Sequence, residues 1–126
     1  MRAFLPLAPV ALLAGCVTAS APSPSPWLVG LWLGEEDGVQ FPLACESGLP
    51  IRYLPGGRYA LFEERGTWRL DGDRLTETAT EATGAGDEGT PEIGRPYASR
   101  IARDGSDAFV KTYADGARTR FRRCPE

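Results

Sequence analysis

The chain has 126 residues, with 14 basic and 17 acidic side chains, no histidine and a formal net charge of −3. This mildly acidic balance argues against nucleic acid or phosphate groups as the main binding partner. Without histidine the chain lacks the commonest general base, so neither a Ser-His-Asp nor a Cys-His arrangement can be built. No glycine-rich stretch has the P-loop or the dinucleotide pattern. We therefore expect a non-catalytic protein without a cofactor.

The N-terminus has the layout of a secretory signal. Met1 and Arg2 give a positively charged start, residues 3–13 are uncharged and mostly apolar, and small residues then precede Cys16. The apolar run is shorter than the roughly 20 residues that a membrane-spanning helix needs, and two prolines interrupt it. We therefore expect cleavage rather than a retained transmembrane anchor.

The residues Leu13-Ala14-Gly15-Cys16 resemble the bacterial lipobox. In that motif signal peptidase II cuts before the cysteine and a lipid is attached to its sulfur. The resemblance implies a membrane anchor of more than one acyl chain, which is enough for stable attachment. Val17 stands where an aspartate often signals inner-membrane retention, so the resemblance favours the periplasmic face of an outer membrane. The alternative is an unmodified Cys16, either in a cytosolic protein or beside a cleavage site that lies elsewhere.

Three regions follow along the chain. Residues 1–15 are the expected signal peptide, and residues 16–26 are the lipidated N-terminus with a proline- and serine-rich tether. Such a composition cannot bury a core and forms a semi-extended linker. Residues 27–126 have a length that suits one domain with one hydrophobic core.

Within this domain, short apolar or alternating segments recur about every ten residues, with turn residues between them. We predict strands at 27–33, 39–45, 49–54, 58–63, 67–70, 74–80, 97–103, 108–113 and 117–123. Pro42 suggests that the second of these is an edge strand or a bulge. Residues 81–96 are rich in glycine and proline and predict a long mobile loop, a kind of loop that is often functional. Eight or nine strands in sequence order favour an all-β fold, a small antiparallel up-and-down barrel.

Cys45 and Cys124 are the two cysteines that remain for the folded domain. An exported compartment is oxidising, so we predict a disulfide that ties an early strand to the last one. The alternatives are a reactive thiol or a metal site. Two cysteines without any histidine make a poor zinc site, so we expect no metal.

Gly30-Leu31-Trp32 lies on the first predicted strand, ahead of a run of strands that ends with arginines. This arrangement resembles the lipocalin-like (calycin) group. In that group the tryptophan of a Gly-x-Trp motif closes one end of the barrel and stacks under an arginine from near the end of the chain. A guanidinium over an indole face is a favourable cation–π contact.

Three residues of the last strand could supply the arginine, namely Arg120, Arg122 and Arg123, and we favour Arg122. Gly66-Thr67-Trp68 matches the same two-residue pattern. The alternative is therefore that Trp32 and Trp68 are ordinary core aromatics. The domain is short for a lipocalin with a deep cavity, so we expect a filled barrel.

Residues 45–66 resemble the periplasmic inhibitors of C-type lysozyme, which carry an inhibitory loop of the Ser-Gly-x-x-Tyr type. The resemblance implies that Ser47 and Tyr53 are inhibitory residues. An acidic exterior would help such a protein meet a basic lysozyme.

Arg118, Arg120 and Arg122 alternate along the last predicted strand and would share one face. One interpretation is a stripe for an anionic ligand or a lipid headgroup. The other is a solvated outer face that pairs with carboxylates of neighbouring strands, such as Glu77.

Together these features favour a lipid-anchored protein of the cell envelope with a binding role, for a small apolar ligand or for a partner protein. The alternatives are a lysozyme inhibitor and a structural envelope protein without a discrete ligand. An apolar cavity in the barrel would favour ligand binding, and a filled core would favour the structural role.

Overall fold

The computed structural model describes residues 26–82 and 92–126. The predicted signal peptide, the lipidation site Cys16, nearly all of the tether and most of the predicted loop at 81–96 lie outside the described residues. Within the described ranges, no helix is long and apolar enough to cross a membrane.

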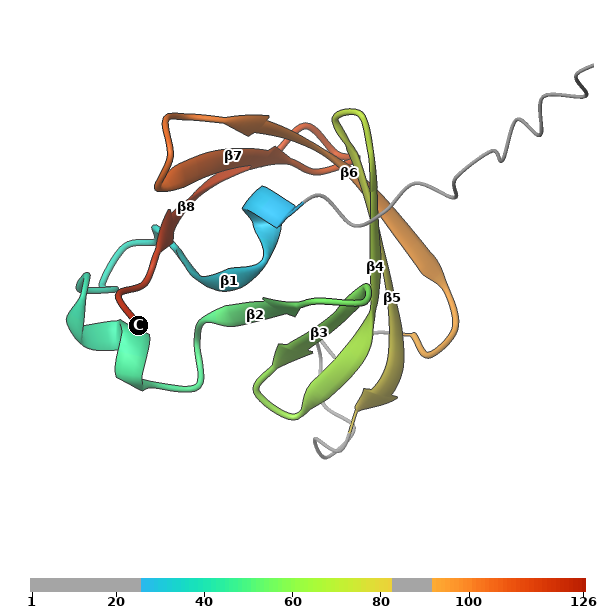
Figure 1. Ribbon diagram of the computed structural model, residues 1–126, viewed down its shortest axis with the longest axis horizontal. Helices are drawn as coiled ribbons and strands as arrows, with labels where there is room; N and C mark the ends of the chain where they lie inside the picture. Colours follow the sequence, from blue (N-terminus) through green and yellow to red (C-terminus); the bar gives the residue numbers. More distant parts are fainter. Residues whose placement is uncertain (1–25, 83–91) are drawn as a thin grey trace, which may run out of the picture.

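The described residues form eight strands and two short 3₁₀ helices (Figure 1). The strands are β1 (Gly30–Gly34), β2 (Ile51–Leu54), β3 (Arg58–Leu61), β4 (Glu64–Asp71), β5 (Arg74–Ala82), β6 (Pro96–Arg103), β7 (Ala108–Thr112) and β8 (Arg118–Arg123). The 3₁₀ helices are η1 (Pro26–Leu28) and η2 (Leu43–Glu46). Each strand pairs with the next in antiparallel fashion, and β8 pairs with β1. The chain is therefore a closed up-and-down barrel of lipocalin-like architecture, as predicted.

The alternation along β4 shows why these residues form strands. Gly66, Trp68 and Leu70 are buried, whereas the residues between them are exposed. A period of two places every second side chain inside the barrel. The β2–β3 turn contains Gly56 and Gly57, which both have positive φ angles (84° and 77°), a conformation that glycine adopts without steric cost. The local sequence therefore encodes both the strands and their tight connections.

The strand predicted at 39–45 is wrong. These residues belong to the long β1–β2 connection, which contains η2 and leaves Leu43 69% exposed. Pro42 lacks the N–H that a sheet ladder requires. The apolar letters of this segment therefore do not represent a buried strand face.

A disulfide joins Cys45, in η2, to Cys124, directly after β8. The pairing is as predicted, but its position differs because Cys45 does not lie on a strand. The bond fastens the β1–β2 connection to the end of the last strand. It holds in place a segment that contributes to one rim of the barrel.

The fully buried core gathers at the other end of the barrel. Its largest completely buried side chains are Leu28, Trp32, Tyr53, Leu75 and Phe109. Leu28 belongs to η1, which lies within the outline of the barrel in Figure 1. This end is filled by side chains, and we call it the closed end. The β1–β2, β3–β4 and β7–β8 connections surround the opposite, open end.

Candidate functional site

The closed end is sealed by an arginine over a tryptophan. The guanidinium carbon of Arg123 lies 4.2 Å from the centre of the Trp32 ring. Arg123 donates hydrogen bonds to the carbonyl oxygens of Val29 (3.0 Å) and Trp27 (2.6 Å). The indole Nε1 of Trp32 donates to the carbonyl oxygen of Leu28 (2.9 Å). Arg123 and Trp32 thus also provide hydrogen-bond donors for the backbone carbonyls of residues 27–29, which cross the closed end of the barrel.

Gly30 makes room for this arrangement. A Cβ at this position would lie 2.4 Å from Nη1 of Arg123, and the φ angle of 142° also favours glycine. The glycine and the tryptophan of the Gly-x-Trp motif therefore have separate physical roles. One gives the guanidinium space, and the other gives it a π face.

The prediction that Arg122 closes the barrel is wrong, because Arg123 does so. In the β1–β8 register Trp32 lies opposite Arg123, so these two residues share the inner face. Arg122 has the opposite orientation and lies 3.8 Å above the ring of Phe41 in the β1–β2 connection. Counting residues from the end of the chain cannot distinguish the two arginines, whereas strand register does.

Trp68, the tryptophan of the second Gly-x-Trp match, is an ordinary core aromatic. Its indole N–H donates to the carbonyl oxygens of Arg58 (2.8 Å) and Leu54 (3.2 Å), at the β2–β3 turn. It packs edge-to-face with Tyr53. The alternative interpretation, an ordinary core aromatic, therefore applies to Trp68 but not to Trp32.

A cavity of about 650 Å³ occupies the open end of the barrel. The expectation of a filled barrel is therefore wrong. The apolar and aromatic part of the lining includes Val39, Leu49, Ile51, Tyr59, Leu61, Ala79, Tyr97, Tyr113 and Phe121. Small residues at the wall, such as Gly34 and Ala79, leave space that larger side chains would occupy. A short barrel can therefore be hollow at one end when its inner side chains there are small.

A buried ion pair stands in this cavity. Lys111 of β7 pairs with Glu77 of β5, and their side chains are only 10% and 13% exposed. Tyr53 donates its hydroxyl hydrogen to the other carboxylate oxygen of Glu77 (2.8 Å). Burial raises the pKa of the Tyr53 phenol well above its ordinary value, and the negative charge of Glu77 adds to this shift. Glu77 is therefore an inner residue, and the suggestion that it pairs with outer arginines is wrong.

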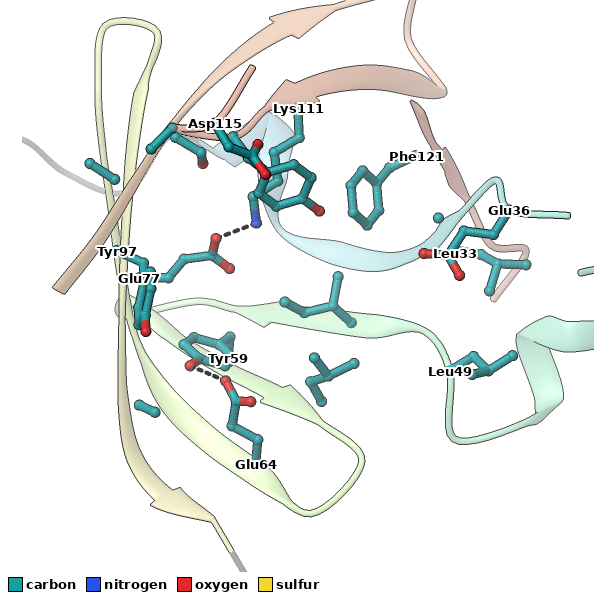
Figure 2. A pocket seen from close by; sticks show the side chains of 18 of the residues that line it. Leu33, Glu36, Leu49, Tyr59, Glu64, Glu77, Tyr97, Lys111, Asp115 and Phe121 are labelled. Atoms are coloured by element: carbon teal, nitrogen blue, oxygen red, sulfur yellow. Dashed lines mark hydrogen bonds and ion pairs between the residues drawn. The ribbon is translucent and has the colours of Figure 1, made fainter. Parts of the chain in front are cut away.

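Carboxylates also lie around the cavity. Glu64 accepts a hydrogen bond from the hydroxyl of Tyr59, whose pKa is raised mainly by burial and further by this contact. Figure 2 shows Glu36, Glu64 and Asp115 on different sides of the cavity, and a dashed line joins Lys111 to Glu77. Three separate elements thus bring acidic groups to one opening.

Ser99 of β6 adds an unsatisfied polar group at the cavity wall. The residue is 8% exposed, and its hydroxyl oxygen has no hydrogen-bond partner among the described residues. Buried hydroxyls are normally paired, so such a group marks a position where a bound molecule could supply the partner.

The two residues expected in an inhibitory loop are not presented together. Tyr53 is only 1% exposed and belongs to β2 inside the barrel. The hydroxyl of Ser47 donates to the carbonyl oxygen of Ala44 (2.5 Å) and accepts from the backbone N–H of Leu49 (3.2 Å). Ser47 therefore shapes its own turn. A partner protein cannot contact Tyr53, so the predicted inhibitory pair is wrong.

The alternating arginines of β8 lie along its outer face. Arg120 donates to Glu35 (2.8 Å) and to Asp104 (3.0 Å), and Arg122 lies 3.5 Å from Glu35. These contacts favour the interpretation of a solvated outer face. The carboxylate partners come from the neighbouring loops.

Lys111 was not predicted as a site residue, although two signals in the sequence mark it. It is the one lysine of the chain, against thirteen arginines. It also shares its strand face with the buried Phe109, two residues earlier. The same period of two places Glu77 on the face of Leu75 and Ala79. Because this inner face mixes polar and apolar residues, it does not show the apolar alternation that identifies most buried strand faces.

The site defines a class of protein: a lipocalin-like barrel with one sealed end and one hollow end that carries a charged pair. Among the described residues, no three metal-ligating side chains cluster closely enough to hold an ion. No family model, no curated protein and no solved structure matches the chain.

Proposed function

We propose that this protein is a lipid-anchored binding protein of the cell envelope, which holds a small, largely apolar ligand in the open end of its barrel without catalysis. The cavity is the observation that carries this proposal. Its volume of about 650 Å³ lies within the range of typical small-molecule pockets, and its wall is mainly aliphatic and aromatic. The alternative of a structural protein depended on a filled core, which this barrel does not have.

The Cys45–Cys124 disulfide supports the envelope location. Disulfides persist in oxidising compartments and are rare in the cytosol. The lipobox-like residues around Cys16 supply the anchor of this proposal, and the following proline-rich residues supply a tether between membrane and barrel. Metabolic labelling with an alkynyl fatty acid tests the anchor. We expect label on the wild type and none on the Cys16→Ser variant, whereas equal labelling of the two would contradict the anchor.

A cavity-filling variant tests the ligand site. Ala79 is buried at the cavity wall, and Thr80, the next residue of β5, is exposed. We expect the wild-type domain to enhance the fluorescence of the neutral apolar dye N-phenyl-1-naphthylamine. Ala79→Phe should abolish this enhancement, because the new ring occupies the cavity, and Thr80→Phe should leave it unchanged.

Circular dichroism would verify that each variant is folded, and Leu61→Trp offers a second way to fill the cavity if Ala79→Phe does not fold. Absence of dye binding to the wild type, or undiminished binding by folded cavity-filled variants, would overturn the proposal. If the proposal holds, mass spectrometry of the domain purified from its native host would identify any ligand that remains bound.

A further inference from the structure

We propose that the ligand of the open end is an amphipathic organic cation, whose apolar part fills the cavity and whose charged head lies among the carboxylates. This inference rests on the proposed binding function and specifies its substrate class. The lining includes four carboxylates, those of Glu36, Glu64, Glu77 and Asp115, and one ammonium group, that of Lys111. In a partly enclosed space such an excess of one sign focuses the potential and attracts the opposite charge.

Lys111 does not offer a free site for an anion. Its ammonium group is already paired with Glu77 in a nearly buried position. A ligand carboxylate that displaced Glu77 would leave that side chain with only the hydroxyl of Tyr53 as a partner. An uncompensated buried charge is strongly unfavourable, so the pair disfavours a fatty-acid-like ligand.

The aromatic rings of the cavity already bind one cation. The ammonium nitrogen of Lys111 lies 5.4 Å from the centre of the Tyr113 ring and 5.9 Å from that of Phe121. Tyr97, 53% exposed, is a further ring of the lining. Ring faces attract alkylated ammonium groups strongly, because such groups are weakly hydrated. Rings and carboxylates together therefore suit an organic cation better than a neutral or anionic head.

The hydroxyl of Ser99 is an independent observation at the same wall. It is buried, and it lacks a hydrogen-bond partner among residues 26–82 and 92–126. The hydroxyl can accept a hydrogen bond from a ligand N–H or donate one to a ligand oxygen. A ligand with a polar group near its apolar part would remove this deficit, whereas a pure hydrocarbon would not.

Three probes with the same decyl chain test the charge preference: decyltrimethylammonium, decanol and decanoate, each titrated against the bound neutral dye. We expect the cation to displace the dye about tenfold more tightly than decanoate at low salt, with a smaller difference at high salt. If the dye does not bind and calorimetric titration detects no binding of any of the three probes, the proposed binding function fails as well. If decanol or decanoate displaces the dye as tightly as the cation, the binding function stands and the cation inference is overturned.

Matched variants separate the lining from the general charge of the protein. Glu36→Gln combined with Asp115→Asn removes two carboxylates of the lining, and Glu46→Gln combined with Asp71→Asn removes two exposed carboxylates outside it. We expect the first double variant to bind decyltrimethylammonium several-fold more weakly while its affinity for decanol is unchanged. The second double variant should bind both probes as the wild type does. An equal loss of cation affinity in both pairs would show that only the net charge matters and would contradict the inference. Tighter cation binding by Lys111→Met would support it.

Discussion

The two ends of this barrel are built from the same alternating strands, yet they are suited to different tasks. At the closed end Trp32 and Phe109 pack edge-to-face with their ring centres 4.8 Å apart, and both side chains are completely buried. At the open end the inner positions carry small residues, carboxylates and the single lysine, and a cavity remains. Phe121, which stacks on Phe109 at 4.9 Å, marks the boundary between them. The difference shows that inner side-chain size, rather than strand topology, decides where a small barrel is hollow.

The two ends also treat their charges differently. Arg123 at the closed end is fixed by two backbone carbonyls and an indole face, so its charge is used for structure. Lys111 at the open end is held by the carboxylate of Glu77 in a cavity that a small molecule can enter. We therefore expect substitutions at the closed end to change stability, and those at the open end to change binding.

Phe109→Ala should lower the free energy of unfolding by about 4 kcal/mol, because the ring is completely buried and the neighbouring rings cannot collapse into the space. Phe121→Ala should cost less, because this ring is only partly buried and lines an existing cavity. Urea unfolding monitored by tryptophan fluorescence measures both. Equal losses for the two variants would contradict the distinction between the ends.

Replacement of both cysteines by alanine should cost about 3 kcal/mol of stability, because the disulfide closes a long loop in the unfolded chain. The change should also weaken dye binding, since Val39 and Leu49 of the fastened connection line the cavity. Thermal unfolding and dye titration of the double variant measure the two effects. Unchanged dye affinity would show that the open end does not depend on this bond.

Arg123→Met should destabilise the barrel by about 2 kcal/mol, since two carbonyls lose a charged donor and Trp32 loses its cation. Arg122→Met provides the matched control on the adjacent residue. It removes a contact with Phe41 at a partly exposed site, which is worth at most about 1 kcal/mol. Denaturation curves distinguish the variants, and a larger loss for Arg122→Met would restore Arg122 as the closing residue. Dye binding should change little in either variant.

Alkaline pH should lower the free energy of unfolding of the barrel through the buried phenol of Tyr53. Burial raises the pKa of Tyr53 above its ordinary value of 10.0, so the unfolded chain releases this proton at a lower pH than the folded barrel does. The contribution of Tyr53 to stability is intact below pH 10.0 and declines as the pH rises toward the folded pKa, by about 1.4 kcal/mol per pH unit for one group.

Tyr53→Phe should therefore give a shallower decrease of stability above pH 10.0 than the wild type shows. Urea unfolding at successive alkaline pH values measures the slope, and tyrosine absorbance follows ionisation. Parallel slopes for wild type and variant would assign the alkaline loss to other groups. The wild type and Tyr53→Phe should differ much less in slope near neutral pH, which provides the internal control.

Most of the barrel could be predicted from the sequence, because alternation and turn residues are local signals. The period of two in β4 and the glycines of the β2–β3 turn encode strand and connection within a few residues. The segment at 39–45 misled this reasoning, because apolar residues there lie in a connection that the disulfide fastens to the barrel. Local composition does not report which residues a distant cysteine will fix in place.

Residue type and approximate spacing were enough to predict the closed antiparallel barrel, the Cys45–Cys124 pairing and the importance of Trp32. That Arg123 rather than Arg122 covers Trp32 depends on strand register, which is a long-range property and became visible only in the folded barrel. The same is true of the hollow open end and of the pairing of Glu77 with Lys111. The size of a cavity depends on many side chains that are distant from one another in the sequence, so no local pattern predicts it.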